Sequence, residues 1–219
     1  MDQEHITIRT ADGIDIAGIY RTPENPRGAV ILLHMMPAVK ESWNNFSNEL
    51  EKAGYTSVAI DERGHGESIM RGKLDYKKFT EAEQQAKILD VEAAFHFLQQ
   101  HGFEESQIIV IGASIGANLA IQFAFEHAQI PFVIALSPGL NYRGVKTDGF
   151  ITQLHEGQRV VLVSSDDDDR ESAVSCMELH RLNPSQTIWI EKNSLGHGTS
   201  MFDKDPALMQ DLILQLPLN

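Results

Sequence analysis

A short motif that joins a buried strand to a helix constrains this fold more than any other feature. Residues 112–116 read Gly-Ala-Ser-Ile-Gly and follow directly on the apolar run of residues 108–111. Residues 117–124 are largely apolar and predict a helix immediately after the motif. Glycines must flank the serine because side chains at those positions would keep the strand and the helix apart. We therefore expect Ser114 to lie in a strained strand-to-helix turn.

A strained serine at such a turn is a candidate nucleophile. Backbone strain persists where the surrounding fold over-determines it, usually at a functional site. A helix that begins at Ile115 would direct backbone N–H groups and the positive end of its dipole at the space above Ser114, where an oxyanion would form. Gly-x-Ser-x-Gly also occurs by chance, so this interpretation depends on whether an acid and a base follow it in the right order.

Two later strands lead into side chains that could supply the acid and the base. Residues 159–163 predict a parallel strand, which is followed by two serines and then four aspartates at positions 166–169. Residues 186–190 predict the next strand, and the loop after it holds His197 between two glycines. Ligands bind at the carboxyl ends of strands in open α/β sheets, so we expect a carboxylate and His197 to lie near Ser114. Histidine can accept a serine proton and return it to a leaving group, while a carboxylate orients the imidazole.

Two motifs in the first half of the chain complete a resemblance to the α/β-hydrolase family. An apolar strand at residues 29–33 precedes His-Met-Met-Pro at 34–37, and residues 59–68 read Ala-Ile-Asp-Glu-Arg-Gly-His-Gly-Glu-Ser. The chain is similar to this family from about residue 6 to residue 216, and it resembles small serine esterases and dienelactone hydrolases that lack a large lid. The resemblance implies one α/β-hydrolase domain over residues 1–219, with a mostly parallel eight-stranded sheet, helices on both faces and a minimal cap.

The resemblance also implies a catalytic triad of Ser114, Asp168 and His197. In the family the acid usually lies in a turn written His-Gly-x-x-Asp after the seventh strand, and that pattern selects Asp168. Asp167 or Asp169 would serve after a slip of one residue. The other aspartates of the run are expected to be solvated.

An oxyanion hole is implied at the backbone N–H groups of Met36 and Ile115. Met35 stands where the family usually has glycine, and its Cβ would constrain the loop. The Met35 N–H is therefore the alternative donor to the Met36 N–H. The motif at residues 59–68 is expected to be structural, with its arginine and aspartate tying loops beneath the site. His65 in that motif precedes Ser114 in the chain and is not expected to be the base.

The expected substrate is a small or medium acyl ester in an open cleft. The segment from 137 to 159, where many family members insert a helical lid, is short and rich in turn residues. Met35, Leu140 and Met201 could form an adaptable apolar wall. A helix is expected over residues 77–101, with Phe79 in packing rather than in a pocket.

Composition narrows the partners and the compartment. The formal net charge of −13 argues against nucleic acid and membrane partners, which need a basic surface, and disfavours anionic substrates except near local cations such as Arg143 and Arg170. The single Cys176 fits a reducing cytoplasm, and no leader or membrane span is evident. We expect no cofactor and no metal, and either a monomer or a homodimer.

The expected reaction is acyl transfer to water by a serine carboxylesterase. A thioesterase, an amidase or a small peptidase could use the same triad, and a catalytically silent hydrolase fold could bind a ligand instead. The dehalogenase and epoxide-hydrolase branches of the family place aspartate at the elbow, so Ser114 disfavours them.

Overall fold

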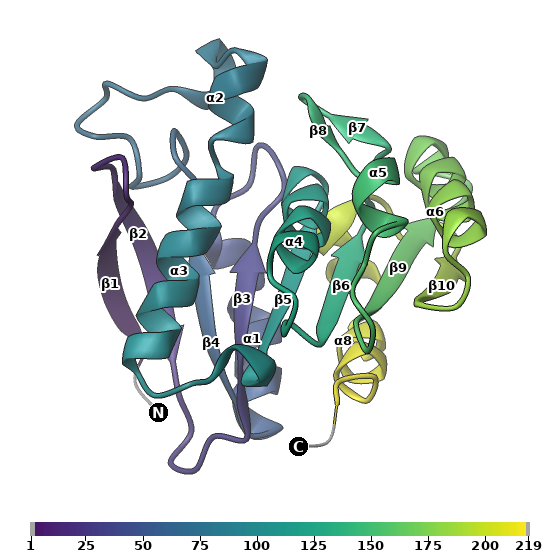
Figure 1. Cartoon of the computed structure of the whole chain (residues 1–219), viewed down its shortest axis with the longest axis horizontal. Helices are drawn as coiled ribbons and strands as arrows, with labels where there is room; N and C mark the ends of the chain where they lie inside the picture. Colours follow the sequence, from purple (N-terminus) through teal and green to yellow (C-terminus); the bar gives the residue numbers. More distant parts are fainter. Residues whose placement is uncertain (1–2, 218–219) are drawn as a thin grey trace.

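Eight strands build the central sheet of the computed structural model, which describes residues 3–217 (Figure 1). In the order in which they lie across the sheet, they are β1 (Glu4–Arg9), β2 (Asp15–Arg21), β4 (Tyr55–Ile60), β3 (Gly28–Leu33), β5 (Ile108–Ala113), β6 (Phe132–Leu136), β9 (Arg159–Ser165) and β10 (Thr187–Lys192). β2 is antiparallel to both of its neighbours, and every other pairing in this sheet is parallel. The predicted mostly parallel sheet is confirmed. The single domain over residues 1–219 stays a prediction, and residues 1–2 and 218–219 lie outside the described part.

The central strands are buried along their whole length, which explains their uninterrupted apolar sequences. All residues of β3, β4, β5 and β6 are buried. Strands of a parallel sheet are covered on both faces and therefore need apolar side chains on both sides. The register pairs Leu33 with Gly112, and Ala113 with Leu136. β3, β5 and β6 therefore end together, at one edge of the sheet.

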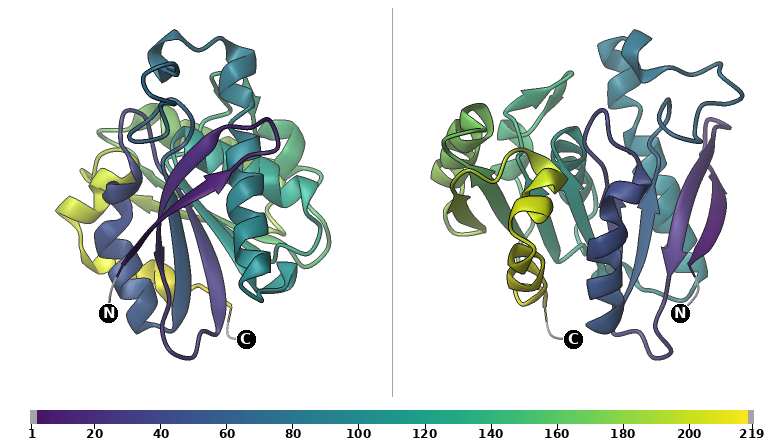
Figure 2. Two further views of the ribbon diagram at one scale, coloured as in Figure 1. Left: turned by 90° about the vertical axis from the view of Figure 1, so that its left-hand side faces the viewer. Right: turned by 180° about the vertical axis from the view of Figure 1, so that it is seen from behind.

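Helices cover both faces of the sheet, as Figure 2 shows. One face carries α1 (Asn44–Lys52), α7 (Met201–Lys204) and α8 (Ala207–Ile213), and the other carries α3 (Ile88–Gln100), α4 (Ile115–Glu126) and α6 (Arg170–Leu182). Phe46 and Leu212 pack in the core beneath the first face, and Phe95 and Phe123 pack beneath the second. No helix in residues 3–217 combines the length and the apolar character needed to cross a bilayer.

The predicted helix over residues 77–101 is interrupted. The structure has a 3₁₀ turn η2 (Tyr76–Lys78), then α2 (Glu81–Gln85), and only then α3. A new helix begins after Thr80 because its hydroxyl accepts the Glu83 N–H while the Glu83 carboxylate accepts the Thr80 N–H. The last helical segment is likewise divided into α7 (Met201–Lys204) and α8 (Ala207–Ile213), with Pro206 at the start of the second.

The cap is small, as expected, but two segments build it. The first is the segment predicted as loop, which contains the hairpin of β7 (Asn141–Tyr142) and β8 (Val145–Lys146) and one turn of helix, α5 (Asp148–Ile151). The second is the segment between β4 and α3, which carries α2 and rises above the carboxyl edge of the sheet (Figure 1). Gln85 Nε2 donates a hydrogen bond to the Gly144 carbonyl oxygen at 3.3 Å, so the two segments touch.

Candidate active site

Ser114 lies in the strained turn that the sequence predicts. Its backbone has φ 55° and ψ −119°, and it immediately precedes the first residue of α4. A Cβ on Gly112 would lie 2.0 Å from the Gly116 carbonyl oxygen, and a Cβ on Gly116 would lie 2.5 Å from the Leu33 carbonyl oxygen. The two glycines therefore permit strand β5, helix α4 and strand β3 to approach one another. The serine side chain is left half-buried at the carboxyl edge of the sheet.

His197 pairs with Asp169, on the loops that follow β10 and β9. His197 Nδ1 lies 2.8 Å from Asp169 Oδ2, and the Asp169 side chain is only 10% exposed. Ser172 donates a hydrogen bond to the other carboxylate oxygen at 3.0 Å, which fixes the carboxylate plane. Since an ionised carboxylate only accepts hydrogen bonds, the proton of this pair belongs on His197 Nδ1. Nε2 of His197 is then free to act as a base.

The prediction that Asp168 partners the histidine is wrong by one residue. Asp168 Oδ1 accepts hydrogen bonds from Ser165 Oγ at 2.6 Å and from the Gly196 N–H at 3.0 Å, and Oδ2 pairs with Lys204 at 2.9 Å. These contacts, with the Ser165 hydrogen bond first, lower the pKa of Asp168 to about 2. Residues 166–168 form a turn after β9, so it is Asp169, directly before α6, that faces His197.

The other aspartates of the run bind the loop rather than the histidine. Asp167 accepts hydrogen bonds from the backbone N–H and the hydroxyl of Ser194. Together with the bond from Gly196 to Asp168, these contacts attach the loop after β9 to the loop that carries His197. Ser137, at the end of β6 with φ 51°, adds a third attachment because its hydroxyl accepts the Gly198 N–H at 2.9 Å. Nothing in the sequence alone singled out Ser137.

A buried histidine orients the backbone of residues 35–36, which form the proposed oxyanion loop after β3. His34 Nε2 accepts the Glu62 N–H at 3.1 Å, so the imidazole proton belongs on Nδ1, which lies 3.0 Å from the Met35 carbonyl oxygen. The hydrogen bond to that carbonyl fixes the peptide between Met35 and Met36. In a trans peptide the N–H points opposite to the carbonyl, so the Met36 N–H points away from His34.

The apolar wall expected from three side chains does not form. Met201 is fully buried in the core on the α1 and α8 face, so it cannot contact a substrate. Met35 packs against that same core, whereas Leu140 packs against the core on the opposite face of the sheet. The sequence gives no measure of where a methionine or leucine points, and these two cores lie on different sides of the sheet.

A cleft that borders Met36 and Pro37 is instead lined mainly by the two cap segments. It has a volume of about 300 Å³. Its lining residues are Met36, Pro37, Tyr76, Lys77, Phe79, Gln84 and Arg143. Phe79 was expected in packing, but here it borders the cleft. Among residues 3–217, no three His, Cys, Asp or Glu side chains are grouped so that they could hold a metal ion.

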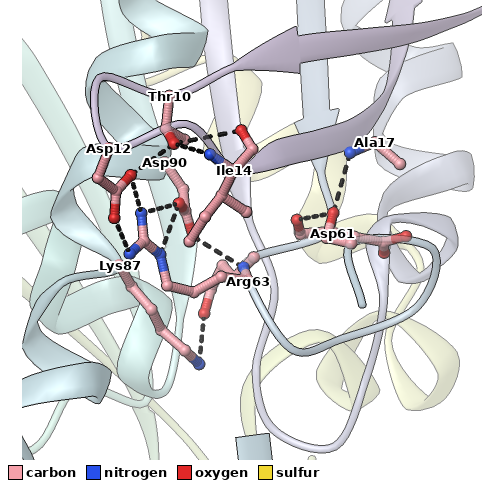
Figure 3. Close-up of polar contacts among 10 residues, drawn as sticks. Thr10, Asp12, Ile14, Ala17, Asp61, Arg63, Lys87 and Asp90 are labelled. Atoms are coloured by element: carbon pink, nitrogen blue, oxygen red, sulfur yellow. Dashed lines mark hydrogen bonds and ion pairs between the residues drawn. The ribbon is translucent and has the colours of Figure 1, made fainter. Parts of the chain in front are cut away.

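Arg63 and Asp61 connect loops, as predicted, and Figure 3 shows Arg63 between Asp12 and Asp90. The Arg63 guanidinium binds both Asp12 and Asp90, with Nη1 to Asp12 Oδ2 at 2.7 Å and Nε to Asp90 Oδ1 at 2.9 Å. Asp61 accepts hydrogen bonds from the backbone and the ammonium of Lys40, each at 2.8 Å. These contacts join the β1–β2 turn, the segment after β4 and helix α3, and so support the second cap segment.

His65 belongs to this buried layer and is not placed as a base. It is 2% exposed, its ring stacks on Tyr76 with centroids 3.8 Å apart, and its Nε2 lies 3.2 Å from Lys87 Nζ. Burial and the neighbouring Lys87 ammonium lower the pKa of His65 to about 3. The imidazole is therefore neutral in the folded protein at neutral pH.

The lowered pKa of His65 predicts a loss of stability in mild acid. The ordinary pKa of histidine is 6.5, so below that pH the unfolded chain binds a proton at His65. The folded chain binds that proton only near pH 3. The contribution is fully present above pH 6.5 and falls as the pH drops towards 3, by a few kcal/mol in all. Urea unfolding at several pH values between 7.5 and 4 should show a shallower loss for His65→Gln than for wild type. Identical slopes for the two proteins would contradict the assignment.

The fold and the elbow serine together define an α/β hydrolase. The family model described as serine aminopeptidase, S33, matches residues 24–187, which is more than half of the chain, and the chain therefore belongs to this family. The matched residues include Ser114 and Asp169 and end before His197. Membership in this family supports a hydrolase.

Curated relatives match only part of the chain. The uncharacterized protein RP471 of Rickettsia prowazekii is 30% identical over 132 residues, which is 58% of this chain and 52% of that protein. Epoxide hydrolase B of Mycobacterium tuberculosis is 33% identical over 147 residues, which is 66% of this chain and 38% of that protein. The match thus spans about half, or less, of each of these relatives.

Solved structures match nearly the whole chain. The esterase Pf2001 of Pyrococcus furiosus superposes with a TM-score of 0.80 at 20% identity, covering 97% of this chain and 91% of that chain. An alpha-beta serine hydrolase homologue from Coxiella burnetii gives a TM-score of 0.76 at 16% identity and covers 99% of both chains. At these identities the likeness shows the shared fold.

Proposed function

We propose that the protein hydrolyses carboxylic esters through an acyl-enzyme on Ser114. The observation that carries this proposal is the pairing of His197 with the shielded carboxylate of Asp169, on loops at the sheet edge where the elbow presents Ser114. A serine hydroxyl is a weak nucleophile at neutral pH and needs a base within hydrogen-bond reach. In the proposed triad His197 is that base and Asp169 orients it.

Each step of the proposed reaction assigns a task to a residue of this chain. Ser114 Oγ attacks the ester carbonyl while its proton moves to His197 Nε2, and Asp169 stabilises the imidazolium. His197 then gives that proton to the departing alcohol. Water attacks the acyl-enzyme with His197 as base, which releases the acid and restores Ser114. None of these steps requires a cofactor.

The negative charge that develops on the carbonyl oxygen is assigned to two backbone donors. The Ile115 N–H belongs to the first residue of α4, where amides lack a partner within the helix and the helix dipole is positive. The Met36 N–H is the second donor, and the bond from His34 to the Met35 carbonyl holds its peptide. Each such donor typically contributes about 2.7–4 kcal/mol of transition-state stabilisation.

Peptide or amide cleavage is the second candidate, because the matching family model is described as serine aminopeptidase. The same triad could attack an amide, with the proton delivered to a leaving amine instead of an alcohol. Epoxide hydrolysis, which the name of the Mycobacterium relative suggests, is disfavoured because this chain has Ser114 at the elbow and not the aspartate that the family resemblance implies for that branch. A silent ligand-binding fold is the reading that an absence of turnover would favour.

The experiment that tests the proposal combines turnover with labelling. Wild type is incubated with p-nitrophenyl esters from acetate to decanoate, and separately with a fluorophosphonate, which esterifies an activated serine. We expect ester turnover, one label per chain at Ser114 by mass spectrometry, and loss of turnover in proportion to labelling. Ser114→Ala is the control and should take no label. If a folded protein turns over only aminoacyl amides, the second candidate is correct; neither turnover nor label would reject both.

A further inference from the structure

The cleft beside Met36 carries two positive charges and no negative one. Lys77 from η2 and Arg143 from the tip of the β7–β8 hairpin both line it. No Asp or Glu is among the lining residues. The two cations come from the two cap segments, which the bond between Gln85 and Gly144 joins above the sheet.

Neither cation is neutralised by the described part of the protein. Within residues 3–217, no carboxylate lies within ion-pair distance of Lys77 or Arg143, whereas Lys78 pairs with Asp75 at 3.6 Å. The buried basic groups beneath the site are paired too: Lys40 contacts Asp61 at 2.8 Å, and Lys87 contacts Glu62 at 2.9 Å. In a chain with 31 acidic and 18 basic residues, a cleft lined by two cations and no carboxylate departs from the overall negative charge of the protein.

The backbone around Arg143 is held in place. The Gly144 N–H donates to Asn141 Oδ1 at 2.9 Å, and the Gly144 carbonyl accepts from Gln85, so the tip is fixed from both sides. Arg143 has φ 52°, which places it in the left-handed turn of this hairpin. A guanidinium on a fixed turn can bind a carboxylate through two parallel hydrogen bonds.

We infer that the substrate is an ester that carries a carboxylate, which Arg143 and Lys77 bind. The carbon chain between the ester and the carboxylate lies against an aromatic wall. The wall consists of Tyr76 and Phe79, and the cleft begins at Met36, the proposed oxyanion donor. The net charge of the protein repels anions at long range, so this selectivity is local. This inference rests on the proposed ester hydrolysis and names its substrate class.

The test compares esters that differ only in charge. The p-nitrophenyl half-ester of adipate is paired with p-nitrophenyl 6-methylheptanoate, in which an isopropyl group replaces the carboxylate. To place the charge on the alcohol side, 4-acetoxybutanoate is paired with 4-methylpentyl acetate. Because hydrogen bonds to charged groups are strong, we expect kcat/KM of wild type to be roughly tenfold higher for the anionic ester than for the neutral one in at least one pair. The double variant Lys77→Gln/Arg143→Gln should bring that ratio close to one.

Lys78→Gln is the matched control because it removes the same charge one residue away, from a side chain paired with Asp75. It should leave the preference of wild type intact. A wild type that prefers the neutral ester in both pairs, or a double variant that keeps the preference for the anion, would overturn the inference. Turnover of the neutral esters decides the proposed hydrolysis separately. If no ester is cleaved, calorimetry with adipate still decides the inference: binding lost in the double variant supports it, and no binding to wild type refutes it.

Discussion

Replacing Asp169 by Asn is expected to lower kcat for ester hydrolysis about 10⁴-fold with little change in KM. Ser172 donates to Asp169 Oδ1, so an asparagine keeps its carbonyl oxygen there and turns its NH₂ group towards His197 Nδ1. An NH₂ group only donates, which forces the imidazole proton onto Nε2. The imidazole could then no longer accept the Ser114 proton. Steady-state kinetics on a p-nitrophenyl ester, with thermal unfolding to verify the fold, measure this effect.

Asp168→Asn is the matched control, since it makes the same chemical change at the neighbouring residue. An asparagine there can still accept from Ser165 and Gly196, and it loses only the ion pair with the half-exposed Lys204. Such exposed pairs contribute about 0–1 kcal/mol, so kcat should fall by less than roughly tenfold. A larger loss in Asp168→Asn than in Asp169→Asn would restore Asp168 as the proposed acid.

The difference between these two aspartates marks the limit of what the sequence can predict at the site. The sheet and the elbow were predictable because buried parallel strands require continuous apolar runs and the turn requires its glycines. Four consecutive aspartates are chemically identical, so the sequence does not show which of them partners His197. Which one faces His197 depends on where β9 ends and α6 begins, and a turn of three residues separates Ser165 from Asp169.

The cleft was harder to predict than the proposed triad for a related reason. Four of its seven lining residues come from the segment between β4 and α3. Ion pairs and hydrogen bonds of Arg63, Asp61 and Lys87 hold the short elements of that segment, so the segment has no periodic apolar pattern that would predict them. One local signal was available, because Thr80 followed by Glu83 is a capping box that marks the start of α2. Met201 offered no signal at all, since an apolar side chain suits a core and a pocket equally well.

The motif that constrained the fold also gives the largest expected effect on stability. In Gly112→Ala the new Cβ would lie 2.0 Å from the Gly116 carbonyl oxygen and 2.6 Å from the Ala117 nitrogen. Both are backbone atoms of α4, and β5 is hydrogen-bonded between β3 and β6. Neither the helix nor the strand can therefore shift without a large cost in free energy. Overpacking typically costs 1–3 kcal/mol and sometimes more, and we expect about 3 kcal/mol or above here. That corresponds to a fall in Tm of about 6–12 °C for a chain of this size.

Gly149→Ala is the matched control for this substitution. Gly149 lies in α5, and a Cβ there would meet no atom within 4 Å. Replacing glycine by alanine at such a position commonly stabilises a protein by about 0.4–1 kcal/mol, because the unfolded chain loses freedom. Urea and thermal unfolding of both variants should therefore move in opposite directions. Equal stabilities would show that β5 and α4 can separate.

The same measurement in a Ser114→Ala background separates the role of the glycine from that of the serine. The overlap in Gly112→Ala is between a Cβ and the backbone of Gly116 and Ala117, so it does not involve the Ser114 hydroxyl. The free energy of unfolding should fall by the same amount whether or not that hydroxyl is present. A smaller loss in the Ser114→Ala background would mean that the serine side chain itself strains the turn. An equal loss of unfolding free energy would mean that Gly112 permits the close approach of strand and helix. The turn on which the proposed chemistry depends would then form without the Ser114 hydroxyl.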